Sequence, residues 1–249
     1  MASNQDPVLT EQQKGLFWKT CQFILCTVRN WNFRAVNIFS LTSYIVVYLF
    51  ILKFSYAQEI NSDDWEFVRE RKNIKVYRME VGDKTAFRGV GIIEGSPEKL
   101  VGIIHNPSRW KFWIDDLDEG KLLEKKSDFH FVFLQEIDAM WPVKNREIVF
   151  ESIVSRVGPS QILVEMKSVN HPKAPKNSNV RAKVSYTRYR IDPLEGNRMQ
   201  VTFENLSDPG GKIPNFMVDW ASKSFPVSII EGLREEMLNP GQEKAPLPE

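Results

Sequence analysis

The side chains that most often perform catalysis or bind metals are sparse in this chain. Its 249 residues include three histidines, His105, His130 and His171, and two cysteines, Cys21 and Cys26. The histidines lie at spacings that make no metal motif, and neither a Ser-His-Asp triad nor a Gly-rich phosphate loop is identifiable. A triad assembles in space, so its absence from the sequence is weak grounds for excluding catalysis. We expect no metal site and no cofactor.

The ionisable residues exclude some partners. The chain has 33 basic and 32 acidic side chains, and the part from Gln58 onward holds 28 and 30 of them. This balance provides no basic surface for nucleic acid, so we expect no nucleic-acid partner. Both cysteines precede Gln58, which leaves the body of the chain without a disulfide framework or a thiolate nucleophile. His105 precedes Asn106-Pro107 at a predicted helix end, where a cationic ring would favour the helix dipole.

The elements that would position any site form an α+β order, with strands in sequence and helices at the edges. Ser96-Pro97-Glu98 predicts the start of a helix that runs to Ile104. The segment 63–71 is predicted as a short helix, and 107–114 as a second short helical piece. Turn residues and apolar alternation predict the strands 74–81, 85–94, 120–126, 129–137, 146–156, 161–169, 180–191 and 198–206.

Apolar side chains alternate along the later strands. In one predicted strand Val180, Ala182, Val184 and Tyr186 share the apolar side, and in the next Met199, Val201 and Phe203 do the same. A sheet with one apolar face needs a cover, which a C-terminal amphipathic helix over 215–238 supplies. Pro226 lies inside that helix and predicts a kink. The kink either fits the helix to a curved sheet or divides a fixed half from a half that opens as a lid.

The N-terminal part carries a compartment signal. The apolar run from Tyr44 to Leu52 has the length of a signal-peptide core, and Ser55-Tyr56-Ala57 offers small residues for cleavage before Gln58. We therefore divide the chain into residues 1–57 as a signal peptide or membrane anchor, 58–239 as one globular domain, and 240–249 as a flexible Pro-rich tail. An uncleaved anchor, a start codon placed too far upstream and a buried core helix are the alternatives. The signal peptide, the uncleaved anchor and the misplaced start codon all place the domain across a membrane, in the periplasm or facing it.

Two distant motifs connect these elements to a known family. They are Trp141-Pro142-Val143-Lys144-Asn145-Arg146-Glu147 and Asp208-Pro209-Gly210-Gly211-Lys212-Ile213-Pro214, the second of which opens the C-terminal helix. In their order and position they resemble the bacterial branch of the START lipid-transfer family, from about Trp65 to Leu238. The resemblance implies a helix-grip fold, in which a curved antiparallel sheet is closed by a long C-terminal helix over an apolar cavity.

The resemblance also implies which residues touch a ligand. The expected cavity wall comprises Phe131 or its neighbour His130, Trp141, Phe150, Met166, Tyr186, Phe203, Phe216 and Trp220. Arg146 matches a position where the family has an arginine followed by an acid, here Glu147, and either anchors a polar head group or forms a structural ion pair.

Trp110, Phe112 and Trp113 lie among basic residues, which suits a membrane interface, although we expect at least one of them to pack in the core. The resemblance implies a monomer that binds a lipid or other hydrophobic molecule without catalysis and docks at a membrane surface. A helix-grip enzyme, such as a cyclase or hydrolase of an apolar substrate, is the rival hypothesis. A ligand-free interaction domain with a solid core is the third.

Overall fold

The computed structural model describes residues 64–139, 143–176, 179–211 and 215–249, without the side chains of 215–222. The chain divides into two units, Met1–Ile60 and Asn61–Glu249, and all described residues belong to the second. The predicted signal segment 1–57 therefore lies outside the described residues. Within the described part, no helix is long and apolar enough to span a membrane.

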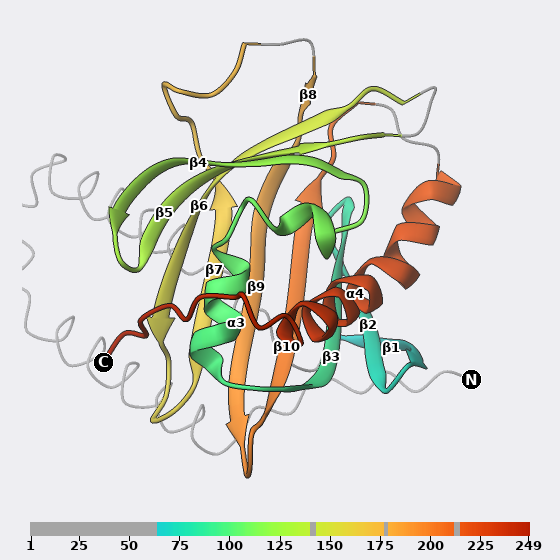
Figure 1. Cartoon of the computed structure of the whole chain (residues 1–249). Helices are drawn as coiled ribbons and strands as arrows, with labels where there is room; N and C mark the ends of the chain where they lie inside the picture. Colours follow the sequence, from blue (N-terminus) through green and yellow to red (C-terminus); the bar gives the residue numbers. More distant parts are fainter. Residues whose placement is uncertain (1–63, 140–142, 177–178, 212–214) are drawn as a thin grey trace, which may run out of the picture. The chain divides into compact units, whose positions relative to one another are not determined.

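A curved antiparallel sheet and two α-helices make up this unit (Figure 1). The helical elements are α3 (Pro97–Ile104), the 3₁₀-helix η2 (Trp110–Phe112) and α4 (Asn215–Met237). The strands are β1 (Glu66–Arg71), β2 (Ile74–Val81), β3 (Lys84–Glu94), β4 (Leu117–Ser127), β5 (His130–Ile137), β6 (Arg146–Arg156), β7 (Ile162–Ser168), β8 (Val180–Arg181), β9 (Lys183–Leu194) and β10 (Arg198–Asp208).

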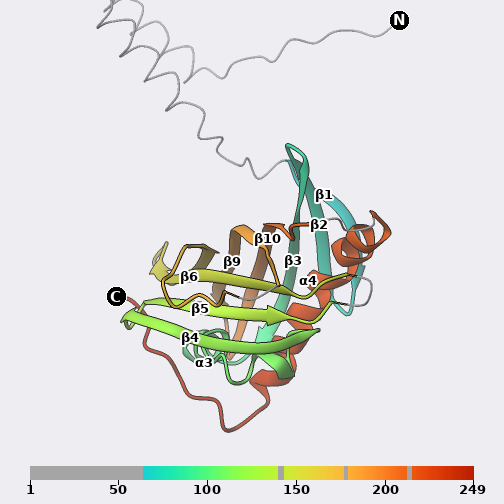
Figure 2. The same cartoon turned by 90° about the horizontal axis from the view of Figure 1, so that it is seen from above.

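The strands form one sheet in the order β1-β2-β3-β10-β9-β7-β6-β5-β4, with the two-residue β8 paired to β6. Every neighbouring pair along this order is antiparallel. Figure 2 shows α4 on one side of the strands β3, β9 and β10, while β4, β5 and β6 bend around that same side. The predicted fold class, an α+β helix-grip architecture closed by a C-terminal helix, is confirmed.

The face of the sheet that α4 covers, the inner face, carries the main hydrophobic core. The C-terminal half of α4 contributes the buried residues Val227, Ile229, Ile230 and Leu233 to it. Two glycines of β3 allow the helix to approach, because a Cβ at Gly89 would lie 2.9 Å from the Pro226 Cβ. This close contact makes α4 a tightly packed cover at its C-terminal half.

The first prediction that fails is the helix over 63–71. Residues Glu66–Arg71 form β1, an edge strand that pairs with β2. The turn between them is Lys72-Asn73, with φ of 52° and 57°, which is the left-handed pair of a two-residue hairpin turn. Ser62 in the sequence is a plausible N-cap and favoured a helix, but pairing with β2 decided the structure.

The helix that starts at Ser96 is confirmed. The Ser96 side chain accepts a hydrogen bond from the Lys99 amide, and Pro97 occupies the first turn of α3. After α3, the chain makes η2, whose Trp110 is buried together with Trp113, whereas Phe112 is 56% exposed. At least one aromatic of this segment was expected in the core, and two are.

The predicted flexible tail is corrected by the structure. Residues 240–249 lie against α3: the Ala245 amide donates a hydrogen bond to the Glu98 carbonyl over 3.0 Å. Ala245 and Leu247 pack against the main core. The prolines suggested a tail separate from the domain, whereas the small and apolar residues between them fit its surface.

Candidate functional site

Four predicted site residues meet on the inner face. Phe150, Met166 and Phe203 belong to the main hydrophobic cluster, and Phe131 packs against it. The residues come from β5, β6, β7 and β10, which are neighbours in the curved sheet apart from the intervening β9. The resemblance therefore placed these four side chains in one apolar surface, as the structure does.

One row of this face mixes apolar and polar side chains. Phe131 pairs with Ser152, Ser152 with Met166, Met166 with Thr187, and Thr187 with Asn205 across five successive strands. Asn205 donates from Nδ2 to the Thr187 Oγ1 over 2.8 Å and accepts from the Ser207 hydroxyl over 2.9 Å. Apolar alternation could not indicate this polar chain, because its members are separated by the turns between strands.

The sheet meets α4 directly beside this row. Phe203 contacts Tyr189 at 5.2 Å and Phe225 of α4 at 5.5 Å between ring centroids. Burial raises the pKa of the Tyr189 hydroxyl, which therefore stays neutral. Phe225, the residue before Pro226, thus closes this part of the inner face by direct aromatic packing.

Arg146 occupies the opposite end of the inner face, where β6 begins. It is 7% exposed, and its Nη2 donates to the Gly210 carbonyl over 3.5 Å, while Nη1 donates to the Lys144 carbonyl. Nε has no hydrogen-bond partner among the described residues. Burial lowers the pKa of Arg146, although an arginine keeps its charge at neutral pH.

The acid beside it serves a different partner. Glu147 points to the other face and accepts from Nε of Arg181 over 2.9 Å. Among the described residues, no carboxylate lies within ion-pair distance of Arg146. The ion-pair alternative for Arg146 therefore lacks a partner there, and a buried cation with an open donor suits an anionic ligand group.

Tyr186 is a correction. It lies in a second cluster with Met79, Ala86 and Leu206, on the outer face of the sheet. Between the pairs Leu206 with Tyr186 and Ser207 with Val184, β9 contains one extra residue. This bulge moves Tyr186 to the opposite face from Val184, which alternation in sequence could not show.

Three further predicted residues cannot be placed. Trp141 lies outside the described residues, and Phe216 and Trp220 lie in the part of α4 whose side chains are not described. His130, the alternative to Phe131, points to the outer face, where its Nε2 lies 3.0 Å from the Glu151 Oε2. His171 lies 3.2 Å from Glu124. No group of three metal-ligating side chains gathers in the described part of the chain.

His105, at the end of α3, differs from the sequence-based expectation of a cationic ring. Its ring packs against that of Phe131, with the ring centroids 4.9 Å apart and the planes tilted by 37°. Nδ1 donates to the Val101 carbonyl over 3.0 Å, and Nε2 accepts from the Ser152 hydroxyl over 2.8 Å. Burial lowers the pKa of His105 to about 4, although the bond to Val101 opposes this. The ring, which is partly buried, is therefore neutral at neutral pH and contributes no positive charge to the helix end.

The His105–Ser152 pair has the donor–acceptor order of a nucleophile and its base, yet it is poorly suited to that chemistry. Ser152 has no exposed surface, and a general base works best with a pKa near the operating pH.

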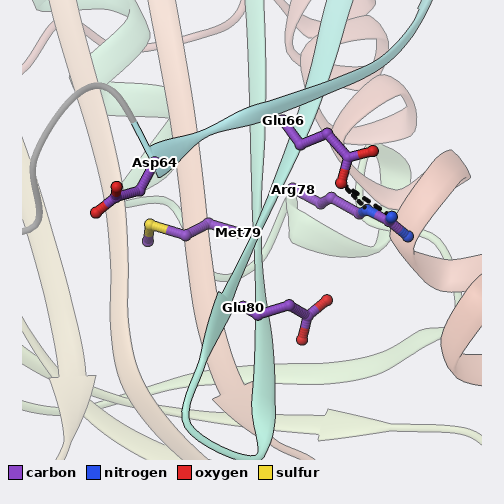
Figure 3. Close-up of a pocket in the computed structure, with 5 residues that line it drawn as sticks. All are labelled: Asp64, Glu66, Arg78, Met79 and Glu80. Atoms are coloured by element: carbon purple, nitrogen blue, oxygen red, sulfur yellow. Dashed lines mark hydrogen bonds and ion pairs between the residues drawn. The ribbon is translucent and has the colours of Figure 1, made fainter. Parts of the chain in front are cut away.

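Figure 3 shows a separate pocket of about 350 Å³ at the β1–β2 edge, lined by Asp64, Glu66, Arg78, Met79 and Glu80. Its arginine is already paired with Glu66 at 2.9 Å, and it contains none of the predicted site residues.

Comparisons with known proteins agree with this geometry. The START domain family matches residues 53–242. An uncharacterized protein of Pseudomonas aeruginosa is 23% identical over 73% of this chain and 90% of its own length. The mouse phosphatidylcholine transfer protein is 27% identical over 65% of the chain and 78% of its own length. A solved fragment of a STAR-related lipid transfer protein from Xanthomonas axonopodis is 23% identical and superposes with a TM-score of 0.64 over 71% of this chain and all of that fragment.

Proposed function

Because the chain belongs to the START domain family, we propose that it binds one lipid molecule between the inner face and α4 and transfers it between membranes. The observation that carries the proposal is the inner face itself. Phe150, Met166 and Phe203 offer an apolar surface, and at its end lies Arg146, a buried guanidinium with an open N–H among the described residues. A lipid has this same polarity, with an apolar chain that ends in a polar group.

Arg146 gives the proposal chemical detail. A guanidinium donates well to phosphate or carboxylate oxygens, and burial makes such a bond stronger than it would be in water. The relative named for phosphatidylcholine transfer supports a phospholipid as the ligand class. We therefore propose a lipid with an anionic phosphate or carboxylate in its polar group.

The proposal is a carrier rather than an enzyme. Among the described residues, His105 is the base that lies beside an inner-face hydroxyl, that of Ser152. The lowered pKa of His105 and the complete burial of Ser152 disfavour proton transfer to a substrate. The polar side chains Thr187, Asn205 and Ser207 already bond to one another. These features support retention of an unchanged ligand.

Membrane contact and export belong to the same proposal. Phe112 is exposed, with the Arg109 guanidinium 4.3 Å from its ring centroid, and this aromatic and basic pair suits a membrane interface. The apolar run before Ala57 supports delivery of the domain to the periplasm. N-terminal sequencing of soluble and membrane fractions tests this delivery. A start at Gln58 would support a cleaved signal peptide, and a full-length form in the membrane fraction would support an anchor. An unprocessed cytoplasmic form would contradict both.

Lipid binding is tested by native mass spectrometry of the purified chain, followed by lipid extraction, and by transfer of fluorescent phosphatidylcholine between phosphatidylcholine vesicles. We expect one bound lipid and measurable transfer. A folded protein with no lipid and no transfer would contradict the proposal and favour a solid core.

Arg146→Leu tests the polar anchor. We expect this variant to retain different lipids, with fewer anionic phosphate or carboxylate groups, while the site stays occupied. Arg190→Leu is the matched control, because Arg190 is exposed and does not lie on the inner face. Its Nε is 3.1 Å from Oδ2 of Asp192. An unchanged lipid profile with lowered stability in Arg146→Leu would assign Arg146 a structural role.

A further inference from the structure

The last residues of the chain, 239–249, form what we call the C-terminal strap. It crosses α3 after leaving α4, as Figure 1 shows. The Ala245 amide bonds to the Glu98 carbonyl, and the Pro248 carbonyl accepts from Nε of Arg156 over 3.0 Å. Leu247 packs against the main core. The strap is therefore attached to α3 and β6 as well as to α4.

Gly102 shows how closely the strap approaches α3. A Cβ built at this position would lie 2.1 Å from the Glu243 carbonyl oxygen, a distance that no side chain tolerates. A glycine inside a helix is otherwise unfavourable relative to alanine. The absence of a side chain at Gly102 is what allows the strap backbone to lie on the helix.

The junction of α4 and the strap is a polar cluster around Glu236. This carboxylate is 6% exposed and accepts from Arg109 over 2.8 Å, from Asn239 over 3.3 Å and from Gln242 of the strap. Lys99 of α3 donates to the carbonyls of Met237 and Asn239 over 2.7 and 2.8 Å. Lysine at a helix C-terminus satisfies free carbonyls and favours the dipole.

Burial opposes ionisation of Glu236, but the bonds from Arg109 and Gln242 outweigh it and leave the pKa of this carboxyl lowered. The charged carboxylate thus ties together the loop before η2, the end of α4 and the strap. Removing the strap would leave this buried charge with fewer donors, which costs stability locally.

We propose that the C-terminal strap is a latch that holds the half of α4 after Pro226 against the sheet. Any opening that admits a lipid is then confined to the half of α4 before Pro226. Pro226 lacks the amide that would continue the hydrogen-bond ladder of α4, which makes this residue the weakest point between the halves. The half after it is fixed by the core, by Lys99 and by the strap. The effect on lipid exchange rests on the proposed function, whereas the latch itself does not.

Gly102→Ala in the full chain tests the latch. The new methyl group forces the strap off α3, and we expect hydrogen exchange of the amides of 229–237 to accelerate about tenfold, as when one or two net hydrogen bonds are lost. Transfer of fluorescent phosphatidylcholine between phosphatidylcholine vesicles should accelerate several-fold. Gly241→Ala is the control, because the nearest atom to a Cβ there is the Asn239 Oδ1 at 3.4 Å; we expect it to change neither rate.

A chain that ends at Leu238 gives a second test. It should show the same acceleration, and adding Gly102→Ala to it should have no further effect, because the strap that the methyl group displaces is gone. Unchanged hydrogen exchange in both variants would overturn the latch. Faster exchange of the amides with unchanged lipid transfer would overturn its role in lipid exchange, and a wild-type chain that transfers no lipid would contradict the proposed function instead.

Discussion

The neutral, partly buried His105 predicts how the stability of this protein depends on pH. In the folded protein the pKa of the ring is lowered to about 4 by burial, whereas a histidine in an unfolded chain has an ordinary pKa of about 6.5. At pH 8 the ring is neutral in both states. Between these two pKa values the unfolded chain takes up a proton that the folded protein excludes, so stability falls as the pH falls.

The magnitude follows from the difference between the two pKa values, at roughly 1.4 kcal/mol for each unit. Between pH 8 and pH 5, His105 should lower the free energy of unfolding by about 2 kcal/mol. The loss should reach about 3 kcal/mol below pH 4, where both states are protonated. The carboxyls of Asp208 and Glu236 also have lowered pKa values, so their contribution is lost at lower pH still.

Urea denaturation of the wild-type chain and of His105→Gln, at pH 8 and at pH 5, measures this effect. Glutamine keeps an amide that can bond to Ser152 but does not titrate, so the difference between the two pH dependences isolates the ring. We expect the wild type to lose about 2 kcal/mol more than the variant over this interval. Equal losses would show that the ring is protonated or solvated in the folded protein, and would refute the neutral His105–Ser152 bond.

Three further predictions concern the two faces of the sheet. Gly89→Ala should lower the midpoint of thermal unfolding, at a cost of about 1–3 kcal/mol, because the methyl group meets Pro226; an unchanged midpoint would mean that α4 does not pack closely on β3. Phe203→Ala should cost about 3–5 kcal/mol in urea denaturation and reduce bound lipid, because it removes the contact with Phe225; full occupancy in the folded variant would remove Phe203 from the site. Tyr186→Phe should be neutral or stabilising, since its buried hydroxyl has no partner in the described structure, and a changed lipid profile on mass spectrometry would contradict its position on the outer face.

Much of the fold is written in local sequence. Ser96 and Pro97 start α3 through a cap and a first-turn proline, and Gly82, with φ of 65°, turns β2 into β3. Such features act over a few residues and are visible without the tertiary structure. Turn residues and apolar periodicity indicated most of the strand segments and the covering helix, and the two motifs indicated the family.

Other features depended on how one strand pairs with another. The segment Glu66–Arg71 is a strand because β2 pairs with it, and Tyr186 faces outward because β9 bulges against β10. In both cases the deciding contact is pairing with the next strand, which the pattern of residues inside the segment does not show. A single inserted residue reverses the face of a strand, since side chains alternate with a period of two.

For the site, the sequence by itself determined which side of each later strand is apolar, because side chains alternate along a strand, and the family resemblance implied that Phe131, Phe150, Met166 and Phe203 share one covered surface. Only the tertiary structure decided that His105 bonds to Ser152, 47 positions away. It also decided that Glu147 pairs with Arg181 and not with Arg146, and that the strap lies on Gly102. These contacts join elements whose separation in space is set by sheet curvature and helix packing. Their energies depend on burial, which no local pattern of residues specifies.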